Sequence, residues 1–247
     1  FGISSRGGML MPQTEERNLE LTPRSIGTRD RRPSRTIQFE LSAITNRFTN
    51  NLLSIKSQFE LAEQLKAENN IQYKDVLRSQ VVFLDSALDF FMHEVTKYGM
   101  VQIFQGVWEK TERYDNFTIR LGEISDVLRN PEQENWFLDI VNDSYAEDTF
   151  MSADAVIGQL NLIGVKWQSV ADRAFYEQGS TTPTKDKFKQ TLNTLFRRRN
   201  QIAHQADCLH ETGAKIDIER EDVEKYIADI EKIVTAISEE IEYVNNS

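Results

Sequence analysis

The residues best suited to chemistry lie in one short stretch, Arg199-Asn200-Gln201-Ile202-Ala203-His204. A guanidinium binds phosphate through two parallel hydrogen bonds. An imidazole can give or take a proton near neutral pH because its ordinary pKa is about 6.5. Asn200 adds an amide four residues before His204, so the two share one face of a helix. Together these groups are suited to binding a phosphate and transferring protons beside it.

The segment from Phe188 to Ile202 predicts the amphipathic helix that positions these groups. At 100° per residue, one sector holds the apolar residues Phe188, Leu192, Leu195, Phe196, Ile202 and Ala203. Arg199 falls in the middle of that sector. A cation on an apolar face is costly unless an anion meets it, so this position predicts either a buried acidic partner or a bound phosphate. Arg197 and Arg198 are explained by the favourable field at a helix C-terminus.

The arrangement Arg199-Asn200 followed by His204 resembles the R-N-x-x-x-H form of the Rx4-6H motif of HEPN domains. Those domains are all-helical, and many are metal-independent ribonucleases. Residues 86–95, Ser-Ala-Leu-Asp-Phe-Phe-Met-His-Glu-Val, are similar to the second helix of the RiboL-PSP branch of HEPN proteins. The resemblance covers about residues 36–245, and only the short motif is specific. It implies an all-α, HEPN-like helical bundle.

The resemblance also implies an activity, an endoribonuclease that needs no metal and no cofactor. Its catalytic residues would be Arg199, Asn200 and His204, with the RNA 2′-hydroxyl as the attacking group and a 2′,3′-cyclic phosphate as the product. His204 would act as general base or acid, and Arg199 would stabilise the charge that develops on the phosphate. Asn200 would orient the phosphate or the imidazole. Two further residues could support the site, Arg198 and Asp89, the latter as a carboxylate able to orient Arg199 or His204.

A single histidine cannot readily be both the base and the acid in one cleavage event. HEPN ribonucleases resolve this by pairing two motifs across a dimer interface, so the resemblance implies a homodimer. The apolar face around Arg199 would then be the interface. Family members act as toxins of toxin–antitoxin pairs or as antiphage-defence effectors. One branch is silenced by adenylylation of a tyrosine two residues after the histidine, but that position is Ala206 here. That form of control is not expected, and an antitoxin or guard protein acting by other means stays open.

Two alternatives to a ribonuclease stay open. The chain could be a non-catalytic HEPN module that dimerises or binds a ligand inside a larger defence complex. It could also be a helical scaffold in which Arg199 pairs with a buried acid. The complete set of Arg199, Asn200 and His204 favours catalysis over the non-catalytic module.

Composition is consistent with a water-soluble, intracellular role. The chain has 247 residues, 39% of them hydrophobic and 28% charged, which is typical of globular proteins. No apolar run approaches the ~20 residues needed to cross a bilayer, and no secretory signal is visible. A single cysteine, Cys208, excludes an internal disulfide framework and fits a reducing compartment. We therefore expect a cytoplasmic protein without a membrane partner.

Charge is unevenly distributed along the chain. The formal net charge of −10 argues against a protein that coats nucleic acid over its whole surface. Residues 1–35 nevertheless carry seven arginines against four acids, whereas the remainder carries 22 basic and 35 acidic residues. Residues 1–35 are expected to form a flexible arm, and RNA would have to bind at local clusters of arginine.

The remaining residues, 36–247, are predicted to form the helical domain. Apolar residues at intervals of three and four predict a helix over 36–69 and a second over 72–98, with Gly99 as its stop. The short break between them implies a long antiparallel hairpin. A variable middle region, about 100–185, should contain a helix from the Ser152 cap to Leu162, with Gly164 as its stop. It should also contain a short helix over Trp167–Phe175, and Trp108, Trp136 and Trp167 as core anchors. A closing helix is predicted over Val223–Val244.

Two further groups of polar residues have spacings that could serve a function. His204, Cys208 and His210 form an H-x3-C-x-H pattern, but the paired C-x2-C spacing of common zinc sites is missing, so we predict no metal. Four residues of the second helix, Asp85, Asp89, His93 and Glu94, are spaced to share a polar face. We interpret that face as solvated, with Asp89 the member to test.

Overall fold

The computed structural model describes residues 40–129, 135–209 and 211–245. In these ranges the regular elements are all helices, and the only strand-like pairing is an isolated bridge between Cys208 and Lys215. The predicted all-α fold is therefore confirmed. The predicted arm, residues 1–35, lies outside the described residues, as do Thr36–Phe39 of the first predicted helix.

Two long helices form the predicted antiparallel hairpin, α1 (Leu41–Ala67) and α2 (Tyr73–Phe104). The turn between them uses Asn69, whose φ of 56° lies in the left-handed region that asparagine tolerates. Beside it, the side-chain oxygen of Asn70 accepts a hydrogen bond from the backbone of Gln72 at 3.0 Å. The apolar stripe of α1 is buried against the bundle, through Leu41, Ile44, Phe48, Leu52, Ile55, Phe59 and Ala62.

The prediction that α2 stops at Gly99 is wrong, because the helix continues to Phe104. Gly99 serves packing instead. A Cβ atom added there would lie 2.6 Å from Cβ of Ile163 and 2.9 Å from Cζ3 of Trp108. Since Ile163 follows another helix and Trp108 follows α2 itself, glycine lets three segments meet at one point. Sequence alone cannot separate this use of glycine from a helix stop.

Replacing Gly99 with alanine should therefore destabilise the fold by about 1–3 kcal/mol, although alanine is the better helix former. Gly122 provides a matched control. It lies in a helix too, but an added Cβ would meet no atom within 4 Å. Gly122→Ala should be neutral or slightly stabilising. Urea denaturation of both variants measures the contrast, and equal stabilities would contradict the packing argument.

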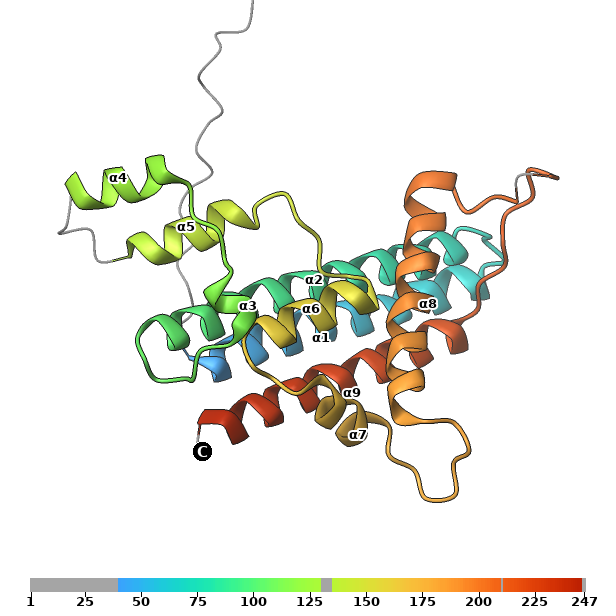
Figure 1. Ribbon diagram of the computed structural model, residues 1–247. Helices are drawn as coiled ribbons and strands as arrows, with labels where there is room; N and C mark the ends of the chain where they lie inside the picture. Colours follow the sequence, from blue (N-terminus) through green and yellow to red (C-terminus); the bar gives the residue numbers. More distant parts are fainter. Residues whose placement is uncertain (1–39, 130–134, 210, 246–247) are drawn as a thin grey trace, which may run out of the picture. The chain divides into compact units, whose positions relative to one another are not determined.

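Two further helices pack on the hairpin, α8 (Thr184–Gln205) and α9 (Arg220–Asn245). Figure 1 shows α9 running beside α1 and α2, whereas α8 crosses α2 and α9. The closing-helix prediction is confirmed. Its buried face is formed by Val223, Ile227, Ile230, Ile233, Val234, Ala236, Ile237 and Ile241.

The middle region, about 100–185, contains five short helices in the described chain, of which the sequence predicts the last two. They are α3 (Glu112–Asp115), α4 (Leu121–Arg129), α5 (Trp136–Ser144), α6 (Ala153–Leu162) and α7 (Trp167–Phe175). The Ser152 cap is confirmed, because its hydroxyl accepts a hydrogen bond from the backbone of Ala155 at 3.2 Å. Gly164 has the positive φ expected of a stop. Trp108 is buried in the core. Trp136 and Trp167 are half-buried and pack against the core.

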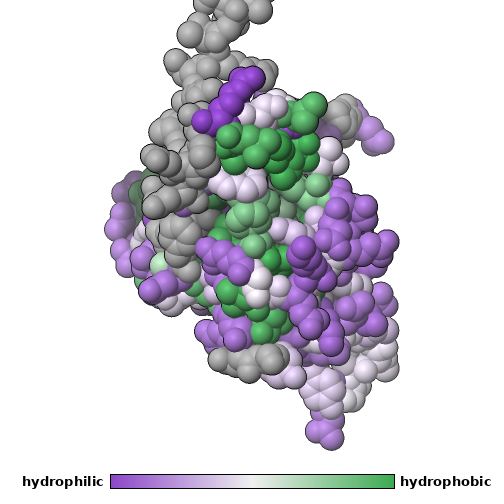
Figure 2. Space-filling model, turned by 60° about the vertical axis from the view of Figure 1, so that its left-hand side comes forward, coloured by the Kyte–Doolittle hydropathy of each residue, from purple (hydrophilic) through white to green (hydrophobic). Residues whose placement is uncertain are grey.

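Helix α4 is unusual in that none of its residues is buried. Its sequence is nevertheless amphipathic, and Leu121 and Leu128 are 80% and 76% exposed. Figure 2 shows apolar side chains gathered on the face that carries this part of the molecule. Helix α4 thus departs from the rule that the apolar face of a helix is covered.

Candidate functional site

The motif lies in the last two turns of α8, which extends the predicted helix to Gln205. The helix ends because Ala206 and Asp207 both adopt left-handed backbone, with φ of 50° and 56°. The backbone N–H of Asp207 donates to the carbonyl of Gln201 at 3.0 Å and closes the last turn. The chain then reverses, so the motif lies at the end of a helix.

The apolar face of α8 is filled by the protein's own bundle. Phe188, Leu192 and Leu195 are buried within the chain, so the prediction that this face forms a dimer interface is wrong for these three residues. The C-terminal part of the same sector is different. Phe196 and Ile202 are half-buried, and Ala203 is exposed. Among the apolar residues of this face, those at the C-terminal end offer surface to another molecule in the described chain.

Arg199 lies beside a buried acid, which is one of the two partners, an acid or a phosphate, that its position predicts. Its Nε lies 3.4 Å from Oδ2 of Asp85 on α2, and its Nη1 donates to Oδ1 of Asn200 at 2.9 Å. The side chain of Asp85 is fully buried, whereas that of Arg199 is 22% exposed. The side chain of Arg199 is thus held from the protein side and still partly exposed. The structure brings Arg199 and Asn200 into direct contact.

Asp85 is one of the four residues of α2 whose spacing could serve a function, and its full burial beside Arg199 contradicts the prediction of a solvated face. Burial raises the pKa of its carboxyl to about 7, against the lowering effect of Arg199 and with a further rise from Asp89. Neither carboxylate oxygen has a hydrogen-bond partner in the described chain. The available signal was its position between Leu84 and Leu88 at the edge of the apolar stripe of α2.

The raised pKa of Asp85 predicts the direction in which folding stability changes with pH. Between about pH 4 and pH 7 the unfolded chain loses this proton while the folded chain keeps it, so folding stability falls as pH rises through that window. Asp85→Asn removes the ionisation. At pH 8 the variant should be more stable than the wild type by about 2 kcal/mol, after discounting for solvent relaxation, and at pH 4 nearly equal.

Urea denaturation at the two pH values measures this effect. Asp143→Asn, which changes an exposed aspartate of α5, controls for the general effect of removing a negative charge. A variant of Asp85 that is less stable than the wild type at pH 8 would show that attraction to Arg199 outweighs the cost of burial.

The other residues of the predicted polar face of α2 are also covered, so the solvated-face prediction is wrong. Oδ1 of Asp89 accepts a hydrogen bond from the backbone of Phe150 at 2.6 Å and lies 3.8 Å from Nε2 of His93. The His93 ring stacks on Phe150, and burial lowers its pKa. Glu94 is buried beside Lys97. The segment before α6 covers this face, and Asp89 hydrogen-bonds to that segment rather than to α8.

His204 lies on the last turn of α8 and is exposed. Within the described ranges, no polar contact holds its ring. Asn200, one turn earlier, is half-buried. The motif therefore combines an anchored cation with an imidazole that is open to an incoming group.

Arg198 has a different role from the one expected. It is buried, and so the field of the helix end does not account for it. It pairs with both oxygens of Asp207, which is 1% exposed, and Asp207 also accepts from Nε of Arg78 on α2 at 2.5 Å. The two arginines additionally donate to the carbonyls of Asp217 and Ile216, at 3.2 and 2.8 Å. This cluster ties the end of α8 to α2 and to the following connector.

Metal ligands do not gather at the motif. Among the described residues, no group of three histidine, cysteine, aspartate or glutamate side chains could hold a metal ion. His210 of the H-x3-C-x-H pattern lies outside those residues. No helix in the described chain is long and apolar enough to cross a bilayer.

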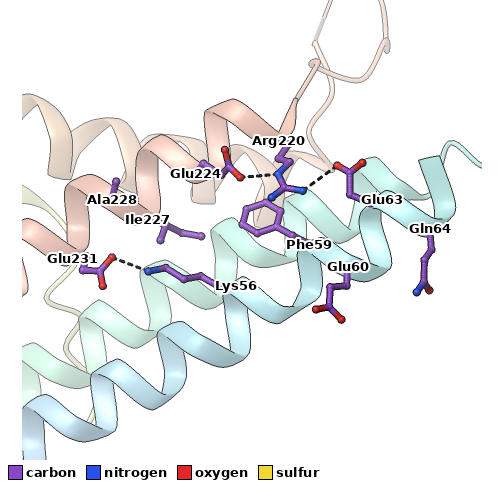
Figure 3. A pocket seen from close by; sticks show the side chains of 10 residues that line it. All are labelled: Lys56, Phe59, Glu60, Glu63, Gln64, Arg220, Glu224, Ile227, Ala228 and Glu231. Carbon is purple, nitrogen blue, oxygen red and sulfur yellow. Dashed lines mark hydrogen bonds and ion pairs between the residues drawn. The ribbon is translucent and has the colours of Figure 1, made fainter. Parts of the chain in front are cut away.

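A large cavity lies away from the motif, between α1 and α9, with a volume of about 710 Å³. Figure 3 shows that ion pairs span it, Lys56 to Glu231 at 2.8 Å and Arg220 to Glu63 at 3.3 Å. Its lining holds two cations and four glutamates, Glu60, Glu63, Glu224 and Glu231. An acidic groove of this kind disfavours a polyanion, so it is not a candidate for binding phosphate.

A family model described as RiboL-PSP-HEPN matches residues 46–243, from within α1 to the last turn of α9. No curated protein and no solved structure shows a significant match to the chain.

Proposed function

This chain belongs to the RiboL-PSP-HEPN family, and from that membership we propose that it is a metal-independent endoribonuclease. One structural observation supports the ribonuclease proposal in addition to family membership. Arg199, Asn200 and His204 lie together at one end of α8, with Arg199 held by Asp85 and its side chain still partly exposed. A phosphate approaching this end would meet a fixed cation beside an open imidazole.

The proposed reaction uses the RNA's own nucleophile. The 2′-oxygen forms a bond to phosphorus while the bond from phosphorus to the 5′-oxygen breaks. His204 takes the proton of the 2′-hydroxyl or gives one to the departing 5′-oxygen, and Arg199 stabilises the negative charge on the phosphate oxygens. Asn200, already bonded to Arg199, orients the guanidinium. The products are a 2′,3′-cyclic phosphate and a 5′-hydroxyl.

The proposal includes a homodimer, because one imidazole per chain serves only one of the two proton transfers. A two-fold axis near the end of α8 would bring both copies of His204 close together. The exposed residues Ala203 and His204 leave this end uncovered in the single chain. A toxin or antiphage-defence effector restrained by an antitoxin or guard protein is the proposed biological setting.

The test is the chemistry of the cut ends. Purified protein is incubated with RNA in EDTA, and the new ends are sequenced with and without enzymatic removal of cyclic phosphates. We expect cyclic phosphates at the 3′ ends, 5′-hydroxyls opposite them, and a dimer by light scattering. Cleavage that needs added Mg²⁺, or that leaves 5′-phosphates, would contradict the mechanism. Full activity at concentrations where the protein is a monomer would contradict the composite site.

The second candidate is a non-catalytic HEPN module. The contact between Arg199 and Asp85 favours it, because the carboxylate could neutralise the arginine without any RNA. In that case the protein would still form a dimer, but RNA would stay intact and expression would not slow the growth of the host.

A further inference from the structure

Helix α8 has a charge opposite to that of the protein as a whole. The chain carries a formal net charge of −10, yet α8 contains six basic residues and one acidic residue, Asp186. Arg198 and Arg199 of this set point into the bundle, where acids meet them. Three of the remaining four are exposed, Lys185, Lys189 and Arg197.

These three residues lie on the same side of α8 as the motif. At 100° per residue, Lys185, Lys189 and Arg197 fall at 0°, 40° and 120° around the helix, and Asn200 and His204 fall at 60° and 100° on that scale. The row therefore leads along one side of α8 to the open imidazole. The same side carries the exposed Asp186, at 100°, and Asn193, at 80°, whose side-chain oxygen accepts a hydrogen bond from the backbone of Ala153 at 3.0 Å. With 1.5 Å of rise per residue, the face from the first lysine to the histidine is about 28 Å long.

Local contacts hold the three cations along this face. Nζ of Lys185 lies 6.0 Å and Nζ of Lys189 lies 5.4 Å from the centre of the Trp167 ring, within the range of a cation–π attraction. Arg197 donates to the carbonyl of Asn193 at 3.2 Å. Lys187 differs, because it is paired with Glu177 at 3.2 Å. Within the described part of the chain, none of the three exposed cations forms an ion pair with a carboxylate.

We propose that this exposed basic face of α8, formed by Lys185, Lys189 and Arg197, is the track along which a single RNA strand reaches His204. The proposal rests on the proposed ribonuclease function and names the part of the surface that holds the substrate. Contacts of this kind are made to phosphates, so the track binds RNA without regard to sequence. It also gives a chain with a large negative charge a local cluster of cations at which a polyanion can bind.

The test measures binding separately from cleavage. All proteins carry His204→Ala, and the probe is a fluorescein-labelled oligouridine strand followed by anisotropy in EDTA. Adding Lys185→Gln and Lys189→Gln should weaken binding about tenfold. The plot of log affinity against log salt should become less steep by about 1.4, at about 0.7 for each phosphate that is no longer neutralised. Arg197→Gln should lower the slope further. The matched control is Lys225→Gln with Lys232→Gln, two exposed lysines of α9.

The outcomes test the track separately from the ribonuclease proposal. Unchanged affinity and salt slope in the α8 variants, equal losses in the α9 control, or no binding of oligouridine at all would overturn it. If RNA binds through these lysines while the wild type leaves RNA uncut, the track stands and the ribonuclease proposal fails. If the wild type cuts RNA and the lysine variants bind as tightly as their parent, the ribonuclease proposal stands and the track fails.

Discussion

Alanine at His204 or at Arg199 should reduce RNA cleavage by about a hundredfold to ten-thousandfold, the range for loss of a general acid–base or of a group that stabilises developing charge. The two losses have different causes. His204 is exposed, so its removal deletes proton transfer and leaves the fold intact. Arg199→Ala also removes the charge facing Asp85. Arg199→Lys should be nearly as inactive, since an ammonium cannot reproduce the planar two-pronged contact with phosphate.

The controls for this experiment separate chemistry from folding. Gln205→Ala changes an exposed residue next to the histidine on the same last turn and should cleave RNA as the wild type does. Each variant is checked by circular dichroism and by urea denaturation. EDTA should leave the wild-type rate unchanged. Alanine variants that are folded and keep full activity would place the reaction elsewhere in the molecule.

The sequence predicts the long helices and the last two short ones because each of these carries its own local signal, whereas α3, α4 and α5 were not predicted. The apolar stripes of α1, α8 and α9, the Ser152 cap and the positive-φ stop at Gly164 are all local features. Gly99 misled because a glycine that ends a helix and a glycine that admits a neighbour look alike in sequence. Only the approach of Ile163 to within 2.6 Å of the missing Cβ position distinguishes them.

The site was predicted less completely because its partners lie far apart along the chain. The helix that carries Arg199, Asn200 and His204 was predicted, and all three lie in the last two turns of α8. Asp85 meets Arg199 from a distant helix, and Arg78 meets Asp207 across 129 residues. A helical projection gives the direction of a side chain on its own helix, but not which helix lies opposite. That is why the sequence predicts neither the burial of Asp85 nor the ion pair between Arg198 and Asp207.

The buried cluster of Arg78, Arg198 and Asp207 makes the second large prediction. One carboxylate lies between two guanidiniums, with side-chain exposures of 1%, 8% and 10% for Asp207, Arg78 and Arg198. Removing the carboxylate leaves two buried cations facing each other. Asp207→Asn should therefore cost about 3–5 kcal/mol of folding stability. Asparagine is the informative replacement, because it tolerates the φ of 56° at this position and keeps the size of the side chain while removing its charge.

Removing one arginine instead leaves a balanced pair, which gives the matched comparison. Arg78→Met keeps Arg198 bonded to both oxygens of Asp207 and loses chiefly the bonds from Arg78 to Asp207, Asp75 and the carbonyl of Ile216. Its cost in urea denaturation should be clearly smaller than that of Asp207→Asn. Equal costs would mean that the loss of hydrogen bonds, and not the presence of unpaired buried charges, determines the stability of the cluster. Because Asp207 lies three residues after His204 at the end of α8, Asp207→Asn should also lower RNA cleavage, whereas Arg78→Met should preserve more of it.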